Sequence, residues 1–289
     1  MRHDADRNRF LLQSSIHHDR SLVLHGQQFH FLDWGAPTAP AVVLLHGITG
    51  HARSWDDEAR TLAAGYRVLV LDQRGHGDSD PAPDGDYTVT TMAGDLTAFV
   101  DAVGLPRISL VGLSMGGRVA IAFAGTHPRR VERLVIVDIG PEIAPAGRLR
   151  VGSLMAQTPE RFDDLEAALA WARATNPRYT DAMLRHRVAH GTRPSQGGLV
   201  WKYDHAIRDA VRSGQWRDPV DLWPLWSAIA CPTLIVRGAE SDVLAPETAK
   251  RMLTTNPLAR LVEVVGAGHT VPGDQPAAFQ QLLTEFLGA

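Results

Sequence analysis

One serine in the sequence has the surroundings of a catalytic nucleophile. The segment Ile108–Gly117 reads ISLVGLSMGG, an apolar run that passes through a G-x-S-x-G motif, centred on Ser114, into a helical pattern. A serine on a sharp turn between a strand and a helix presents its hydroxyl outward, and the flanking glycines leave room for the strained backbone. The backbone N–H of Met115 then points to where an oxyanion would form. The sequence therefore predicts that Ser114 attacks a carbonyl carbon.

Two further segments of the sequence belong with the serine motif. Leu45-His46-Gly47-Ile48 follows one apolar run, and the segment 72–79, DQRGHGDS, follows the next. Together with the serine motif they resemble the α/β-hydrolase family, over about Leu22 to Leu287. The resemblance implies that Ile48 donates a second N–H to the oxyanion. It also implies structural roles for His46 and for the D-x-R-G-x-G-x-S loop, whose Asp72, Arg74 and His76 are not expected to act in catalysis.

A nucleophilic serine needs a base, and the base needs an acid that orients it. Of thirteen histidines, only His269 follows the last predicted strand, and the family order of serine, acid and histidine points to the same residue. Two aspartates compete for the role of the acid. Asp242 follows the run Thr233–Gly238, as in the family pattern, whereas Asp138 ends the preceding run, as in some relatives. We expect Asp242 to be the acid, with Asp138 as the alternative acid. If Asp138 does not orient the histidine, we expect it to support the hinge where an insertion begins.

These residues predict acyl transfer. His269 takes the proton of Ser114, the serine attacks a carbonyl, and the N–H groups of Ile48 and Met115 stabilise the oxyanion. Water then hydrolyses the acyl-enzyme, again with His269 as the base, and this chemistry requires neither a metal ion nor an organic cofactor. A serine at this position argues against the haloalkane dehalogenases and epoxide hydrolases of the family, which use aspartate there.

Apolar side chains flank the predicted catalytic positions, so we expect the substrate to carry an acyl chain or an alkyl group. They are Ile48, Met115, Ile139, Val243, Leu244 and Val271. Small carboxylic esters and lactones, including N-acyl homoserine lactones, fit this environment better than sugars or charged peptides.

Three other functions stay open at this stage. Carbon–carbon bond hydrolases of ring-cleavage pathways share the triad, but they usually carry an H-G-x-G-P-G loop where this chain reads HGITGH over 46–51. A perhydrolase activity is compatible with the Ser-Met-Gly-Gly pattern. A ligand receptor that keeps the triad would turn over slowly or once.

The strands that must position these loops are short, continuous apolar runs, which are typical of a mainly parallel sheet covered by helices. Helical spacing recurs between them at Val89–Val103, Met115–Thr126 and Gln275–Leu287, and an alternating hairpin, Ser21–Trp34, precedes them. This alternation predicts an α/β fold of the α/β-hydrolase type. The runs are Ala41–His46, Tyr66–Asp72, Ile108–Gly112, Leu134–Asp138, Thr233–Gly238 and Leu261–Val265.

No buried strand pattern appears between Asp138 and Thr233. Helical patterns occupy 161–175, 177–190 and 196–212, and five of the seven tryptophans lie there, so we expect a helical cap over residues 141–227. The core would then comprise 21–140 and 228–289, after an N-terminal arm at 1–20. We expect the tryptophans to divide between the interior of the cap and the roof of the substrate pocket, with Trp201 in contact with substrate. They are Trp171, Trp201, Trp216, Trp223 and Trp226.

Composition excludes several classes of protein. The 289 residues are 44% hydrophobic and 21% charged, and 29 Lys and Arg face 32 Asp and Glu, for a net charge of -3. This balance lacks the excess of basic residues that binding to nucleic acid or to an anionic membrane requires, so we expect a small-molecule partner. A single cysteine, Cys231, excludes an internal disulfide and a multi-cysteine zinc site. The sequence shows no signal peptide or membrane span, so we expect a cytoplasmic location.

Overall fold

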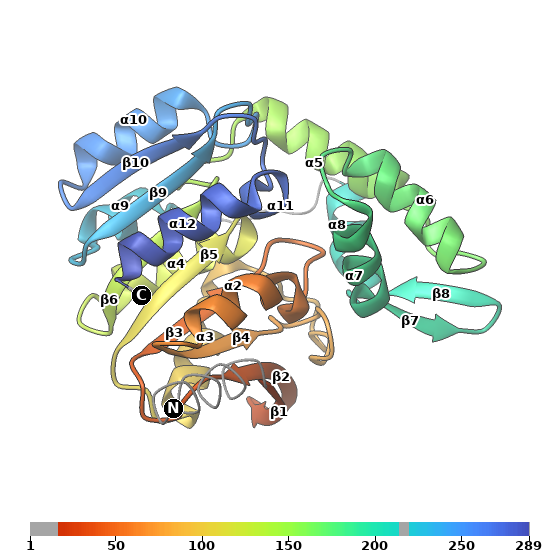
Figure 1. The fold of residues 1–289 in the computed structure, drawn as a ribbon, viewed down its shortest axis with the longest axis horizontal. Helices are drawn as coiled ribbons and strands as arrows, with labels where there is room; N and C mark the ends of the chain where they lie inside the picture. The colour runs from red at the N-terminus through yellow and green to blue at the C-terminus, as the bar shows by residue number, and fades with distance from the viewer. Residues whose placement is uncertain (1–16, 214–219, 289) are drawn as a thin grey trace, which may run out of the picture.

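An eight-stranded sheet lies at the centre of the computed structural model, which describes residues 17–213 and 220–288 (Figure 1). Its strand order is β1-β2-β4-β3-β5-β6-β9-β10. Strand β2 pairs antiparallel with β1 and β4, and the remaining neighbours pair in parallel. The strands are β1 (His17–Leu24), β2 (Gln27–Trp34), β3 (Ala41–Leu45), β4 (Arg67–Leu71), β5 (Ile108–Leu113), β6 (Val131–Val137), β9 (Thr233–Gly238) and β10 (Ala259–Val264).

The two faces of the sheet bury separate apolar cores. Successive strand residues point to opposite faces, so Val43 and Leu45 of β3 enter one core, and Val42 and Leu44 enter the other. The first core is covered by α3 (Val89–Ala102), α4 (Met115–Thr126), α9 (Trp223–Ala228) and α10 (Pro246–Thr255). The second is covered by η1 (Ala52–Trp55), α2 (Asp56–Leu62), α11 (Val271–Asp274) and α12 (Pro276–Leu287). The predicted α/β class with a mainly parallel sheet is confirmed.

The first strand begins earlier than the sequence predicted. We expected residues 17–20 in an N-terminal arm, but they form the start of β1, paired with β2 at the sheet edge. The ring of His17 stacks on Trp34 at 4.5 Å, and Arg20 pairs with Asp33 at 3.1 Å. Polar contacts hold this end of the strand, so it lacks the apolar alternation that would have identified it. Residues 1–16 of the expected arm lie outside the described residues.

A long insertion separates β6 from β9 and extends away from the sheet (Figure 1). Its elements are α5 (Pro145–Gln157), α6 (Leu165–Thr175), α7 (Asp181–Gly191), the hairpin β7 (Thr192–Ser195) and β8 (Gly198–Trp201), and α8 (His205–Arg212). The predicted helix over 196–212 is therefore wrong in its first half. Gly197 and Gly198 both have positive φ, +74° and +146°, which suits a tight hairpin turn and not a helix.

The insertion ends before the predicted boundary at residue 227. Leu222 and Trp226 are fully buried in the core on the α4 face of the sheet, and the Trp226 Nε1–H donates to the Met252 carbonyl at 2.9 Å. Helix α9 therefore belongs to the core. Trp216 lies outside the described residues. Cys231 is a buried free cysteine, and none of the helices in the described ranges has the length and apolar character needed to cross a bilayer.

Candidate active site

Ser114 occupies a strained turn between β5 and α4. Its φ and ψ are +52° and −116°, a conformation that non-glycine residues rarely adopt and that costs about 1–3 kcal/mol. The flanking glycines are sterically required. A Cβ at Gly116 would lie 2.5 Å from the Leu45 carbonyl oxygen, and one at Gly112 would overlap the Gly116 carbonyl. The G-x-S-x-G sequence thus lets α4 pack against β3 and β5 while Ser114 projects from the turn.

Ser114, His269 and Asp138 form a continuous chain of hydrogen bonds. The His269 Nε2 lies 2.9 Å from Ser114 Oγ, and its Nδ1 lies 2.8 Å from Asp138 Oδ2. Because the ionised carboxylate only accepts hydrogen bonds, Nδ1 carries the proton and Nε2 is free to accept the serine proton. Each residue follows the carboxyl end of a parallel strand: β5, β6 and β10 bring the three together.

Asp138 is fully buried and its carboxylate has three donors. The backbone N–H of Gly238 donates to Oδ1 at 2.9 Å, whereas the Ser241 hydroxyl and His269 donate to Oδ2. The residue has a φ of +50°, which turns its side chain away from the direction of β6. These contacts hold the carboxylate in one orientation toward the imidazole.

The expected pairing of His269 with Asp242 is corrected by this geometry. The Asp242 carboxylate is 34% exposed and accepts a hydrogen bond from Arg150 Nε at 2.7 Å, a contact that lowers the pKa of its carboxyl group. Helix α5 lies so close to this loop that a Cβ at Gly147 would be 2.6 Å from the Asp242 carbonyl oxygen. Arg150 follows less than one helical turn later, which explains why Asp242 turns toward α5.

The loop after β3 lies against Ser114. A Cβ at Gly47 would be 3.3 Å from Ser114 Cβ, so the next residue, Ile48, is placed beside the serine. Met115 is the first residue of α4, and its N–H has no acceptor within the helix. The buried His46 holds this loop in place. Its Nδ1–H donates to the Gly47 carbonyl at 2.9 Å, and its Nε2 accepts the Gln73 N–H at 3.1 Å. Ile48 and Met115, the two residues predicted to donate to an oxyanion, are thus both placed next to the serine.

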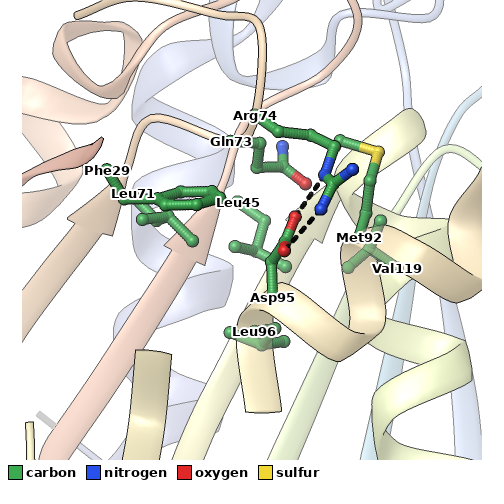
Figure 2. A pocket seen from close by; sticks show the side chains of 9 residues that line it. All are labelled: Phe29, Leu45, Leu71, Gln73, Arg74, Met92, Asp95, Leu96 and Val119. Carbon is green, nitrogen blue, oxygen red and sulfur yellow. Dashed lines mark hydrogen bonds and ion pairs between the residues drawn. The ribbon is translucent and has the colours of Figure 1, made fainter. Parts of the chain in front are cut away.

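The D-x-R-G-x-G-x-S loop makes structural contacts. Asp72 accepts the N–H groups of Ala52 and Asp78 at 2.5 and 3.0 Å and the His30 Nδ1–H at 2.7 Å. Figure 2 shows Arg74 and Asp95 facing each other in a two-bond ion pair of 2.5 and 2.7 Å. Apolar side chains of the sheet and of α3 and α4 surround this pair. They include Phe29, Leu45, Leu71, Met92, Leu96 and Val119.

One group of side chains has the spacing of a metal site. His30, Asp72 and Asp78 place ligand atoms within 4.8 Å of one another. Their contacts account for the arrangement without an ion, because Asp72 already accepts three hydrogen bonds and Asp78 pairs with Lys202 Nζ at 2.7 Å.

A cavity of about 640 Å³ opens above Ser114 and His269, between the sheet edge and the insertion. Its volume falls within the range of small-molecule sites. Its apolar lining comes from the loop after β3, from η1, from the end of β5 and from the helices α5 and α7. The apolar lining residues include Ile48, Trp55, Leu113, Val151, Leu154, Met155 and Met183.

The model of the alpha/beta hydrolase fold family matches residues 40–276. This chain belongs to that family. It is 32% identical over 283 residues to the 3-hydroxybutyrate-oligomer hydrolase of Cupriavidus necator, covering 92% of this chain and 94% of the relative. It is 31% identical over 271 residues to the sn-1-specific diacylglycerol lipase of Mus musculus, covering 90% of this chain and 84% of the lipase. Among solved structures, an E-2-(acetamidomethylene)succinate hydrolase superposes with a TM-score of 0.87 at 25% identity, covering 95% of this chain and all of the other.

Most of the residues that we expected to contact substrate in this alpha/beta hydrolase do not line the cavity. Ile139, Val243, Leu244 and Val271 are at most 2% exposed and pack in the two cores of the sheet. Trp201 packs edge-on against Phe162 at 5.4 Å, inside the insertion. Of the apolar set, Ile48 lines the cavity, and Met115 is buried beside it with its N–H at the start of α4. Proximity to a catalytic residue in sequence did not distinguish lining residues from buried ones.

The charged part of the lining was not predicted from the sequence. Five arginines of this hydrolase reach the cavity, and four of them pair with carboxylates of the lining. Arg53 lies 3.5 Å from Asp56, Arg60 lies 2.6 Å from Asp57, Arg150 binds Asp242, and Arg178 binds Glu240 and Asp274. The fifth is Arg187 of α7. These arginines lie in four different helices and in the turn before α7, so no sequence pattern would have shown this convergence.

Proposed function

We propose that this hydrolase cleaves carboxylic esters through an acyl-enzyme on Ser114. The observation that carries the proposal is the hydrogen-bond chain from Ser114 through His269 to the buried Asp138, with distances of 2.9 and 2.8 Å. A base within hydrogen-bond reach of the nucleophile, itself oriented by a carboxylate, is what acyl transfer by a serine requires.

The reaction follows from the positions of the donors and acceptors. The Ser114 oxygen attacks the ester carbonyl as His269 Nε2 takes its proton, and the N–H groups of Ile48 and Met115 donate to the oxyanion that forms. The imidazolium is stabilised by Asp138 and protonates the leaving alkoxide, so an alcohol departs and the acyl group stays on Ser114. Water then attacks the acyl-enzyme as His269 takes one of its protons. The bond between the acyl carbon and Ser114 breaks as His269 returns that proton to the serine oxygen, and the carboxylic acid is released.

The cavity and the relatives support an ester as the substrate. The apolar side chains of α5 and of the loop after β3 suit a short acyl or alkyl chain. Two relatives act on 3-hydroxybutyrate oligomers and on diacylglycerol, and both of these substrates contain ester bonds. Lactones are cyclic esters and require the same chemistry.

Steady-state kinetics on a panel of substrates tests this proposal. The panel contains 4-nitrophenyl esters of acetate, butyrate and octanoate, a simple lactone, an anilide and a vinylogous 1,5-diketone, each with the wild type and Ser114→Ala. We expect ester turnover by the wild type and a loss of several orders of magnitude in Ser114→Ala, which leaves only residual binding and oxyanion stabilisation. Turnover of the diketone alone would instead indicate a carbon–carbon bond hydrolase. A Ser114→Ala rate within tenfold of the wild type on every ester would exclude the acyl-enzyme.

A further inference from the structure

The cavity above Ser114 contains one cation whose charge is not balanced by the lining. Arg187 is half-buried and reaches the cavity from α7. Among residues 17–213 and 220–288, no carboxylate lies within 4.0 Å of its guanidinium, whereas the other four arginines of the lining each have one. A guanidinium stays charged at physiological pH, so its partial desolvation without a counter-charge is unfavourable unless something else compensates it.

The side chains near Arg187 do not supply that counter-charge. Burial lowers the pKa of His46, and burial lowers that of His51 to about 3; the charge of Arg187 adds to both effects. His51, which contacts the Arg187 carbonyl, and His46 are therefore neutral at pH 7 and supply no negative charge. Glu58 also lines the cavity, but burial raises its pKa to about 8, so at pH 7 it is mainly the uncharged acid. The remaining acids of the lining already pair with other cations.

Helix α7 holds Arg187 close to the loop that carries Ile48. The His51 Nε2–H donates to the Arg187 carbonyl at 3.2 Å, and a Cβ at Gly191 would lie 3.1 Å from the same nitrogen. His186, the residue before Arg187 in α7, lies 3.2 Å from Asp56 at the start of α2. These contacts hold the backbone of α7 at Arg187 against the loop after β3, and Arg187 and Ile48 line the same cavity.

We propose that Arg187 binds a carboxylate of the substrate, so that the preferred substrates are esters that carry a free carboxylate beyond the acyl or alkyl chain. This inference rests on the proposed ester hydrolysis and adds the substrate class. A guanidinium matches a carboxylate with two parallel N–H···O bonds, and such charged bonds are the strong ones in a partly desolvated site. The apolar lining then contacts the chain between the scissile carbonyl and the carboxylate.

Matched pairs of esters test the assignment. One member is the 4-nitrophenyl hydrogen ester of adipate, pimelate or suberate, and the other is the same compound with the free carboxylate methylated. The three chain lengths vary the distance between the scissile carbonyl and the carboxylate. We expect the wild type to favour the charged member at one length or more, and Arg187→Gln to reduce kcat/KM for that member by about 10- to 100-fold. The methylated member has no group for the guanidinium to bind, so its kcat/KM should fall by less than about threefold.

Two variants serve as controls. Arg187→Lys keeps the positive charge but loses the two-bond geometry, so its preference for the charged ester should lie between those of the wild type and Arg187→Gln. Arg60→Gln removes the same unit charge from the lining, but Arg60 is half-exposed and pairs with Asp57 at 2.6 Å, so it should change the ratio of the two esters by less than about threefold. Thermal unfolding of each variant shows whether it is folded.

The outcomes separate this inference from the proposed function. Equal losses on both esters in Arg187→Gln, or a wild type that favours the methylated ester at every length, would overturn the role of Arg187 while ester hydrolysis stands. If no ester is hydrolysed, the proposed function fails, and Arg187 is then judged by calorimetric binding of monomethyl adipate to Ser114→Ala with and without Arg187→Gln. A Kd weakened about tenfold or more by Arg187→Gln supports the carboxylate site, and an unchanged Kd refutes it.

Discussion

Replacing Asp138 by asparagine tests the hydrogen-bond chain at its most buried point. An asparagine side chain has nearly the same shape, but it must place its NH₂ group at one of the two former carboxylate oxygens. The Gly238 N–H donates to Oδ1 at 2.9 Å, so an NH₂ group there would face another donor. The amide oxygen should therefore stay at Oδ1, and the NH₂ should face His269 Nδ1.

This orientation predicts a large kinetic effect. An NH₂ that donates to Nδ1 keeps the imidazole proton on Nε2, so the nitrogen facing Ser114 at 2.9 Å cannot accept the serine proton. The same change in a serine protease lowers the rate by about 10⁴-fold, which corresponds to about 5.5 kcal/mol in the activation free energy. Stability should change much less, because the Ser241 hydroxyl can rotate to accept from the NH₂ group.

The assay is kcat/KM on 4-nitrophenyl acetate for the wild type, Asp138→Asn and Asp242→Asn, with melting temperatures for all three. Asp242→Asn breaks a half-exposed pair with Arg150, an interaction of about 0–1 kcal/mol, so its rate should fall by less than about fivefold. A loss of 10³-fold or more in Asp242→Asn, with Asp138→Asn within tenfold of the wild type, would refute the assignment of Asp138 as the acid that orients His269.

Three further expectations follow from the packing and the buried charges. Gly116→Ala should destabilise the fold by about 3 kcal/mol or more, because the new Cβ would lie 2.5 Å from the Leu45 carbonyl oxygen. Gly94→Ala is the control: no atom lies within 4 Å of its Cβ, so the substitution should be neutral or stabilising. Urea unfolding measures both. The pKa of Glu58 is raised to about 8 in the fold, so the stability that its protonated form contributes is complete below the unfolded value near 4.5 and is lost as pH rises through 8. Between pH 5 and 8, Glu58→Gln should therefore gain up to about 4 kcal/mol in unfolding free energy relative to the wild type. A difference that does not vary with pH would contradict a protonated Glu58. The pKa of His51 is lowered to about 3, so the wild type should lose about 3 kcal/mol between pH 7 and 4 that His51→Gln does not lose, measured by urea unfolding at both pH values.

Local sequence signals were enough to select Ser114 and His269, which the structure places within hydrogen-bond distance of each other. The turn at Ser114 is encoded by the two glycines whose missing side chains allow α4 to approach β3 and β5, and His269 is marked by its place after the last strand. The parallel sheet could also be predicted, because strands buried on both faces read as continuous apolar runs.

The acid depended on information that is not local. Asp138 and Asp242 both follow apolar strands, and the choice between them rests on the sheet order β5-β6-β9, which places the end of β6 next to Ser114. It also rests on the close contact of α5 with the loop after β9, which draws Asp242 to Arg150. Neither contact has a sequence signature.

The lining of the cavity was predictable only in small part for the same reason. Ile139 and Val271 are next to catalytic residues in sequence but point into the cores, whereas Met155 and Arg187 are distant in sequence and reach the cavity from the insertion. Their convergence depends on how the insertion lies over the sheet, and this follows from side-chain packing and not from periodicity.

Mass spectrometry of the intact protein mixed rapidly with a 4-nitrophenyl ester is the most direct test of the central claim that Ser114 carries the acyl group. Mixing followed by acid quenching traps the intermediate, and peptide mapping locates it. We expect a burst of 4-nitrophenolate, one added acyl mass per chain on the peptide that contains Ser114, and neither signal in Ser114→Ala. An acyl group on another residue, or undiminished turnover by Ser114→Ala, would contradict the claim.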